Sequence, residues 1–217
     1  MGRRKKKNIP DGKKVIVLDT ETLGVFDSRI YDLGYVIGNL ADGSIIKARD
    51  YINSEVYDNE NLMQTAYYAN KKPIYEERLA DGYCKKTKWR YIIGMLSRDI
   101  KEYNIDGIYA YNSRFDTRAI AVTCDKCGVK SNPTADGIAD IWKGMTDPHI
   151  TETEAYKEFC MANGFMTKHR KPKCQAKAET VFRYLTGQTD YVEEHTALED
   201  SKIEWAILLK ALELKSA

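Results

Sequence analysis

Two carboxylates stand one residue apart directly after a strongly apolar run. Asp19 and Glu21 follow Val15-Ile16-Val17-Leu18, and this β-branched run favours a buried strand from Lys14 to Leu18. Because side chains alternate along a strand, both carboxylates face the same side, as a hard divalent cation requires. Open sheets bind ligands at the carboxyl ends of their strands. The pair is therefore a candidate metal site, with a solvated strand end as the alternative.

A further carboxylate follows the short apolar segment Gly107–Tyr111. Asn112 is placed to turn the chain, and Asp116 falls in the first turn of a helix expected from Phe115 to Cys127 and ended by Gly128. Asn and Asp are also ordinary capping residues at such a boundary. Taken alone, this segment favours capping over chemistry.

The third cluster begins at His195, which directly precedes a Thr196-x-x-Glu199 capping box. The chain has three histidines, and this one lies among acids at a helix start. A histidine can gain or lose a proton near neutral pH, as a general base must. Asp200 lies in the first turn of that helix, where the helix dipole favours a carboxylate even without metal.

The order of these three motifs is more specific than any one of them. Asp-x-Glu, then Asn-x-x-x-Asp, then His-x-x-x-x-Asp resembles the exonuclease motifs of the DEDD superfamily, in its DnaQ-like branch with histidine in the third motif (DEDDh). The resemblance runs from Val15 to Leu209. It implies a ribonuclease H-like fold, two Mg²⁺ or Mn²⁺ ions, and hydrolysis of single-stranded DNA or RNA from the 3′ end to nucleoside 5′-monophosphates.

The resemblance also implies roles for the motif residues. The metal-binding acids would be Asp19, Glu21, Asp116 and Asp200, and His195 would deprotonate the attacking water. Converging carboxylates repel one another unless cations lie between them, and two ions can together activate water and stabilise the leaving oxygen.

Residues beside the motifs are the substrate-binding candidates. By resemblance, Thr22, Leu23 and Gly24 would hold the terminal nucleotide, although many relatives have Thr where this chain has Leu23. An apolar wedge against the terminal base is one interpretation of that leucine. Asn112 and Phe115 are the other two candidates, with core packing as the alternative for Phe115.

Two more features extend the resemblance. Asp140 is similar to an acid found between the second and third motifs of relatives, although a helix cap explains it equally well. The segment 178–198 is similar to small phage-encoded members of the family. If the protein is phage-encoded, the cytoplasm that the free cysteines and the lack of a signal peptide lead us to expect would be that of the host.

The elements that must position these residues alternate along the chain. Further strands are expected at Ile30–Asn39, 44–52 and 138–142, the first two joined through the Asp42-Gly43 turn. Helices are expected around 89–100, 152–162, 178–185 and from Thr196 onward. This order predicts an α/β fold, a three-layer α/β/α arrangement around a mixed five-stranded sheet.

The charge distribution sets off the start of the chain. Residues 1–14 hold seven Lys or Arg and one acid, which leaves 27 basic and 31 acidic residues in the remainder. We expect a basic flexible arm at 1–13 and a single exonuclease domain at 14–217. The arm would bind nucleic acid or serve as a solubility tail. The basic loop 168–177 could likewise follow a phosphate backbone.

The cysteines and the short apolar runs argue against disulfide-bonded, zinc-binding and membrane-spanning classes of protein. Five cysteines without a signal peptide favour free thiols in a reducing compartment. Cys124 and Cys127 form one Cys-x-x-Cys pair, for which helix packing is favoured over zinc binding. The apolar runs are only a few residues long, so we expect no membrane span.

Two alternatives to the exonuclease stay open. One is a catalytically weak nucleic-acid-binding or polymerase-associated module with the same fold. The other is an RNA-trimming or oligoribonucleotide-degrading enzyme. The expected partner is single-stranded nucleic acid with a free 3′ end, with a polymerase or replication partner as a further option. The sequence leaves the preference for DNA or RNA and the oligomeric state open.

Overall fold

The fold is built around one mixed sheet. The computed structural model describes residues 13–67 and 69–216, so the predicted basic arm lies outside the described residues except for Lys13. The strands run in the order β4-β3-β2-β1-β5-β6. Their bounds are β1 (Lys14–Thr22), β2 (Ile30–Asn39), β3 (Ile45–Asn53), β4 (Lys85–Thr87), β5 (Gly107–Ala110) and β6 (Ala139–Asp140).

The sheet has one strand more than the five predicted. The additional strand, β4, is three residues long and pairs in parallel with the end of β3. It contains Lys85 and Lys86 and no apolar residue, so hydrophobic patterning could not reveal it. Short, lysine-bearing strands are typical of sheet edges, where they discourage pairing with other chains.

The central strand β1 is longer than predicted. It is antiparallel to β2 along its whole length, and Asp19 and Glu21 pair with Gly34 and Asp32. The strand therefore continues past Leu18 to Thr22, and the two carboxylates lie on regular strand backbone. Because β1 is also parallel to β5, the residues that follow β5 lie at the same edge of the sheet.

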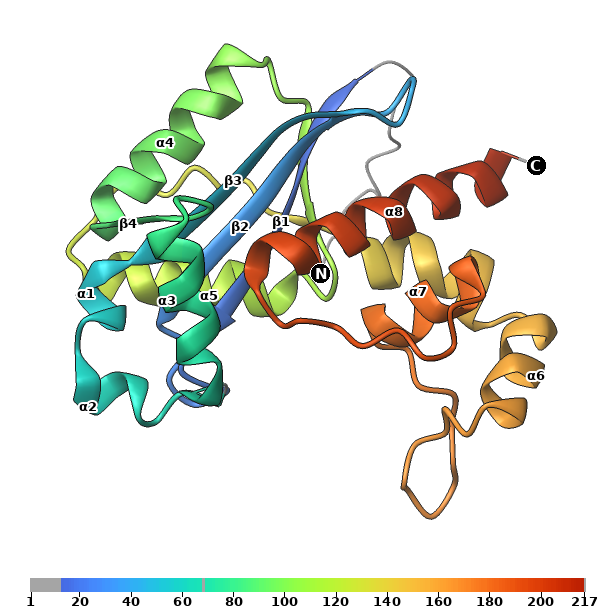
Figure 1. Cartoon of the computed structure of the whole chain (residues 1–217). Helices are drawn as coiled ribbons and strands as arrows, with labels where there is room; N and C mark the ends of the chain where they lie inside the picture. The colour runs from blue at the N-terminus through green and yellow to red at the C-terminus, as the bar shows by residue number, and fades with distance from the viewer. Residues whose placement is uncertain (1–12, 68, 217) are drawn as a thin grey trace, which may run out of the picture.

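Helices cover both faces of the sheet (Figure 1). One face packs against α4 (Trp89–Glu102) and α5 (Arg114–Lys126), and its core includes Ile16, Leu18 and Trp89. The other face includes Val15 and Val17 and packs against a group of four helices. These are the π-helix η2 (Trp142–Thr151), α6 (Glu154–Ala162), α7 (Ala178–Thr186) and α8 (Ala197–Ser216).

A third apolar cluster lies under the segment between β3 and β4. It contains Leu23, Tyr31 and Tyr57. The short elements over it are α1 (Ser54–Tyr57), α2 (Glu60–Met63), η1 (Ala69–Lys71) and α3 (Lys72–Ala80). This cluster buries the turn that follows the first motif.

The strand expected at 138–142 is the least accurate of the predicted elements. Only Ala139 and Asp140 pair as β6, and the chain then enters η2. The Asp140 carboxylate accepts a hydrogen bond from the backbone N–H of Lys143 at 3.0 Å, which favours an early helix start over further extension. Through 13–67 and 69–216, no helix is long and apolar enough to cross a membrane.

Two glycines of β2 allow α8 to lie directly on the sheet. A Cβ at Gly34 would fall 2.1 Å from the backbone nitrogen of Leu198, and one at Gly38 would fall 2.3 Å from the Trp205 ring. Ser201 completes the contact by donating a 2.9 Å hydrogen bond to the carbonyl oxygen of Gly34. This close approach brings the first turn of α8 beside the carboxylates of β1.

Candidate active site

Four carboxylates from three elements face one another across the end of β1. Asp19 and Glu21 lie on the strand, Asp116 lies in the first turn of α5, and Asp200 lies in the first turn of α8. Burial and the neighbouring acids raise the pKa of Asp19 well above its usual range. The acids that contribute are Glu204, Asp116, Asp200 and Glu21. The cluster is thus a point of concentrated negative charge that a cation would stabilise.

Asp116 is held by the first motif. Its Oδ1 accepts a 2.8 Å hydrogen bond from the hydroxyl of Thr20, which lies between the two carboxylates of β1. Burial raises the pKa of Asp116 to about 7, against the lowering effect of the Thr20 hydrogen bond. Thr20, which lies between the two acids of the first motif, therefore holds Asp116, the acid of the second motif, in place.

Asp200 has an oxygen available for a ligand. Its Oδ1 is buried and makes no hydrogen bond with any described group, and burial followed by the charge of Glu193 raises its pKa to about 9. One ligand atom each of Glu21, His195 and Asp200 lie within 4.8 Å of one another. A buried, unpartnered carboxylate oxygen next to a second carboxylate fits a hard divalent cation.

His195 lies at the turn into α8 with an unusual backbone. Its φ of 54° falls in the left-handed region, which is uncommon for a residue with a side chain. Its Nδ1 lies 3.5 Å from Oε2 of Glu193 and 4.0 Å from Oδ2 of Asp200. Burial, and next the positive charge of Lys71, lowers its pKa, so the imidazole is neutral and able to accept a proton at pH 7.

A buried ionic network holds the start of α8. Oδ2 of Asp32 accepts hydrogen bonds from the backbone N–H of Ala197 at 2.9 Å and from the Tyr75 hydroxyl at 3.0 Å. Asp50 lies next to Asp32 and accepts a 2.6 Å bond from Arg78. Burial raises the pKa of both acids, which favours a proton shared between them.

Arg78 connects this network to Thr196 and Glu199, which follow His195. It donates to the Thr196 hydroxyl at 3.4 Å and lies 3.8 Å from the Glu199 carboxylate. The predicted capping box is thus tied to α3 through an arginine. Asp32 was not among the residues predicted from the sequence, although an acid inside the apolar strand Ile30–Asn39 was a usable signal of a buried partner.

Glu204 is a fifth acid beside the four carboxylates, and it was not among the residues predicted from the sequence. It lies one turn after Asp200 on α8, is 3% exposed, and accepts a 3.0 Å hydrogen bond from the backbone N–H of Tyr111. Burial and then the charge of Asp116 raise its pKa well above its usual range. Among the neighbouring charges, Glu204 is the largest contributor to the raised pKa of Asp19. Glu204 therefore belongs to the carboxylate cluster.

An apolar hollow opens beside the carboxylates. Its volume is about 250 Å³, and Thr20, Glu21, Thr22, Gly24, Val25, Tyr67 and Phe115 line it. Three of the predicted substrate-binding residues line this hollow: Thr22, Gly24 and Phe115. Tyr67 is 80% exposed and adds an aromatic ring that lies outside the three motifs.

The structure places the other two substrate-binding candidates elsewhere. Leu23 is 3% exposed and packs in the third apolar cluster. Asn112 is exposed at a turn with a φ of 61°, and its carbonyl oxygen accepts from the N–H of Phe115 at 2.9 Å. Neither side chain lines the hollow, so their roles toward substrate stay predictions.

The cysteine pair is part of the core. The indole N–H of Trp89 donates to Sγ of Cys124 at 3.3 Å, and Cys127 packs at the edge of the same cluster. Across the residues that the structure describes, Glu21, His195 and Asp200 form the one group of metal-ligating side chains. Asp140 adds to the charge around Asp116 while capping η2.

Similarity to other proteins is found at the level of structure. No protein-family model matches the sequence, and neither does any curated protein. The nuclease domain of 3′hExo, described as a DEDDh family member bound to rAMP, aligns with a TM-score of 0.57 and 13% identity over 94% of both chains.

Two further solved structures give the same result. A full-length 3′-exonuclease aligns with a TM-score of 0.61 and 16% identity, over 94% of this chain and 83% of the other. A 3′-exonuclease in a structure of histone mRNA stem-loop recognition aligns with a TM-score of 0.56 and 13% identity, over 96% and 67%. The predicted fold is confirmed: this chain has the ribonuclease H-like fold of DEDDh nuclease domains.

Proposed function

We propose that the chain is a metal-dependent 3′–5′ exonuclease of the DEDDh type. The observation that carries this proposal is the convergence of Asp19, Glu21, Asp116 and Asp200 with His195 beside them, on a fold shared with DEDDh nuclease domains. A binding module would gain nothing from burying so much like charge. Hydrolysis of phosphodiester bonds gives these acids a role, since they would hold two cations.

The donor set fits two Mg²⁺ or Mn²⁺ ions. Carboxylate oxygens are the ligands that both metals prefer, and the unpartnered Oδ1 of Asp200 is a coordination position without another use. When bound, two such ions activate a water and stabilise the leaving 3′ oxygen. The chain's own part is to place Asp19, Glu21, Asp116 and Asp200 around them.

His195 is the proposed general base. Its lowered pKa keeps the ring neutral near pH 7, and its Nδ1 faces Glu193 and Asp200. Those acids orient the ring and stabilise its protonated form after it takes a proton from the attacking water. Tyr75 donates to the carbonyl oxygen of His195 and Asp32 accepts from the N–H of Ala197, so both contacts hold the turn that contains the left-handed backbone.

The apolar hollow is the proposed site of the terminal nucleotide. Phe115 and the exposed ring of Tyr67 line it together with Thr22 and Gly24, and aromatic side chains stack on bases without regard to sequence. One of the similar structures holds rAMP and another concerns an mRNA stem-loop. RNA is accordingly the first substrate to test, beside DNA.

A degradation assay tests the proposal. Single-stranded RNA and DNA oligonucleotides, labelled at the 5′ or the 3′ end, are incubated with Mg²⁺, Mn²⁺ or a chelator. We expect a ladder shortened from the 3′ end with either metal and none with the chelator. The matched control is Asp19→Asn, which keeps the side-chain shape and removes the charge. Intact oligonucleotides with wild-type protein in both metals would overturn the proposal.

A further inference from the structure

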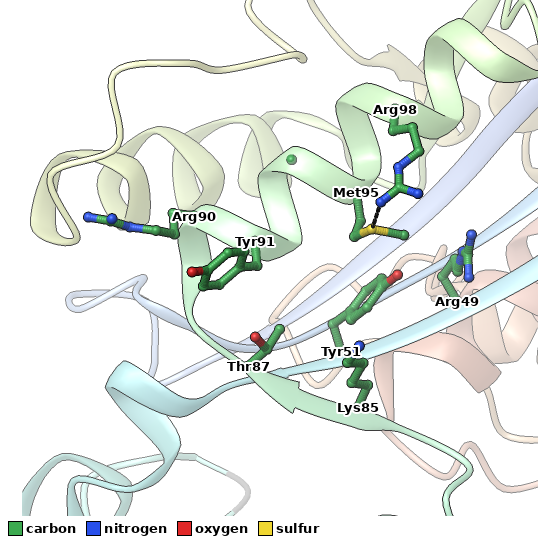
Figure 2. A pocket seen from close by; sticks show the side chains of 9 residues that line it. Arg49, Tyr51, Lys85, Thr87, Arg90, Tyr91, Met95 and Arg98 are labelled. Atoms are coloured by element: carbon green, nitrogen blue, oxygen red, sulfur yellow. Dashed lines mark hydrogen bonds between the residues drawn. The ribbon is translucent and has the colours of Figure 1, made fainter.

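A second cavity lies on the face of the sheet that packs against α4. It is a groove of about 510 Å³ between the β3–β4 edge and α4, lined by Arg49, Lys85, Arg90 and Arg98 with the rings of Tyr51 and Tyr91 (Figure 2). None of its lining residues belongs to the carboxylate cluster or lines the apolar hollow. The groove is thus separate from the candidate active site.

The lining carries positive charge that the protein leaves unpaired. Among the described residues, no Asp or Glu lines the groove. Lys85, Arg90 and Arg98 form no ion pair with any acidic residue of the described part of the chain. Nearby Lys86, which is not part of the lining, is paired with Asp58 at 2.7 Å. Residues 85–101 hold six Lys or Arg and one acid, so the basic character is local to this edge.

One of the four cations is fixed in place. Asp99 is fully buried beneath the groove and accepts hydrogen bonds from Nε and Nη2 of Arg49 at 3.0 and 3.2 Å. The Tyr35 hydroxyl donates to the same carboxylate at 2.8 Å. A guanidinium held by two of its nitrogens presents its remaining edge in a set direction, as phosphate recognition requires.

The wall formed by α4 is open and aromatic. Tyr91 is 60% exposed and stands near Thr87 in Figure 2. Gly94, one turn further along the same wall, has no atom within 4 Å of the position that a Cβ would occupy. Packing does not require a glycine there, and glycine inside a helix costs about 0.5–1 kcal/mol relative to alanine. Because Gly94 has no side chain, the surface of α4 stays open to the groove between Tyr91 and Arg98.

We propose that this groove binds a nucleic-acid strand, with the basic side chains on its phosphates and Tyr91 on a base. The inference rests on the proposed function, since the strand would be the exonuclease substrate held away from its cleaved end. Cations without an acidic partner beside an exposed aromatic ring, here Tyr91, are the pattern by which single strands are bound without sequence preference. A strand of two nucleotides is too short to occupy the groove and the candidate active site together, whereas a strand of thirty nucleotides can occupy both.

Binding without cleavage tests the groove directly. The affinity of full-length protein for a fluorescent thirty-nucleotide RNA is measured by anisotropy, with a chelator present and at several salt concentrations. For Arg90→Glu with Arg98→Glu, we expect at least tenfold weaker binding and a salt slope reduced by about 1.4, because two phosphate contacts are lost. Lys130→Glu with Lys157→Glu is the matched control, since both residues are exposed and outside the groove.

Tyr91→Ala tests the base contact. We expect about tenfold weaker RNA binding with an unchanged salt slope, and no change for an abasic oligomer of the same length. Equal losses for RNA and the abasic oligomer would overturn the base contact. Wild-type affinity in the double charge reversal would overturn the groove as a binding site.

Activity then separates this inference from the proposed function. Groove variants should raise the KM for the thirty-nucleotide substrate and leave the cleavage rate of a dinucleotide unchanged. If wild-type protein binds RNA but cleaves nothing, the proposed function fails while the anisotropy result still decides the groove. If the variants cleave and bind the long substrate as the wild type does, the groove inference fails and the exonuclease stands.

Discussion

The hydroxyl of Thr20 donates a 2.8 Å hydrogen bond to Oδ1 of Asp116, 96 positions later in the chain. This contact joins the centre of the first motif to the acid of the second. It lowers the pKa of a carboxyl group that burial raises to about 7. Thr20 thus both positions Asp116 and favours the ionised form that a cation needs.

We expect Thr20→Val to lower activity about 10- to 100-fold, the cost of a hydrogen bond to a charged group. The loss should be greatest at low Mg²⁺ and near pH 7, because Asp116 without its donor stays protonated to a higher pH. Rates measured against Mg²⁺ concentration at pH 7 and pH 9 check this. Thr20→Ser, which keeps the hydroxyl, is the control, and equal losses in both variants would contradict the explanation.

His195→Asn separates the imidazole from the backbone turn. Asparagine tolerates a left-handed backbone better than most residues, so the φ of 54° at this position should be retained. We expect a rate lower by about 10²–10⁴ with an unchanged melting temperature. In the wild type, activity should fall below a pKa that is lower than the usual value for histidine. An unchanged pH profile in the variant would count against His195 as the base.

Glu204→Gln tests the fifth acid. Its amide oxygen can still accept from the N–H of Tyr111, while the charge that contributes to the raised pKa of Asp19 is removed. We expect a higher melting temperature in chelator at pH 8 and a higher Mg²⁺ concentration for half-maximal rate. Glu213→Gln, exposed near the end of the same helix, is the control. A variant whose metal requirement and stability both match the wild type would show that Glu204 does not act on the cluster.

The raised pKa values predict how stability depends on pH. In the folded protein, Asp116 keeps its proton up to about pH 7 and Asp200 keeps its proton up to about pH 9. In the unfolded chain, an aspartate loses its proton near pH 4. This contribution is therefore present at low pH and is lost as the pH rises to about 9. We expect the melting temperature in chelator to fall between pH 6 and pH 9.

Metal should reverse that loss. At a hundred times its Kd, a cation adds about 2.7 kcal/mol of stability, or roughly 5–10 °C for a chain of this size. The increase should be larger at pH 9 than at pH 6, because the ligands must be deprotonated. Calorimetry with Mg²⁺ or Mn²⁺ and with chelator measures it. Stability that rises with pH in chelator would contradict the sign derived from these acids.

The local motifs were predictable because each lies next to a strongly patterned element. Apolar residues lead directly into Asp19, and a capping box follows His195, so strand alternation and helix signals located both. What patterning could not give is how far α8 lies from the sheet. That distance depends on Gly34 and Gly38, whose missing side chains matter only once Leu198 and Trp205 are packed on them.

Asp32 and Glu204 were missed for a different reason. Each is an acid between apolar neighbours, a signal that indicates burial but does not identify the partner of the carboxylate. Their significance depends on burial and on partners distant in sequence, such as Ala197 and Tyr111. Strand β4 likewise forms by pairing with the end of β3 rather than through local preference.

The central claim is that water attacks a terminal phosphodiester and the 3′ oxygen leaves. Cleavage of a single-stranded oligonucleotide in ¹⁸O-labelled water, with Mg²⁺ or Mn²⁺, measures this by mass spectrometry of the released nucleotide. We expect nucleoside 5′-monophosphates whose phosphate carries one ¹⁸O, and none of this product from Asp19→Asn. Nucleoside 3′-monophosphates, an unlabelled phosphate, or no product from the wild type would contradict it.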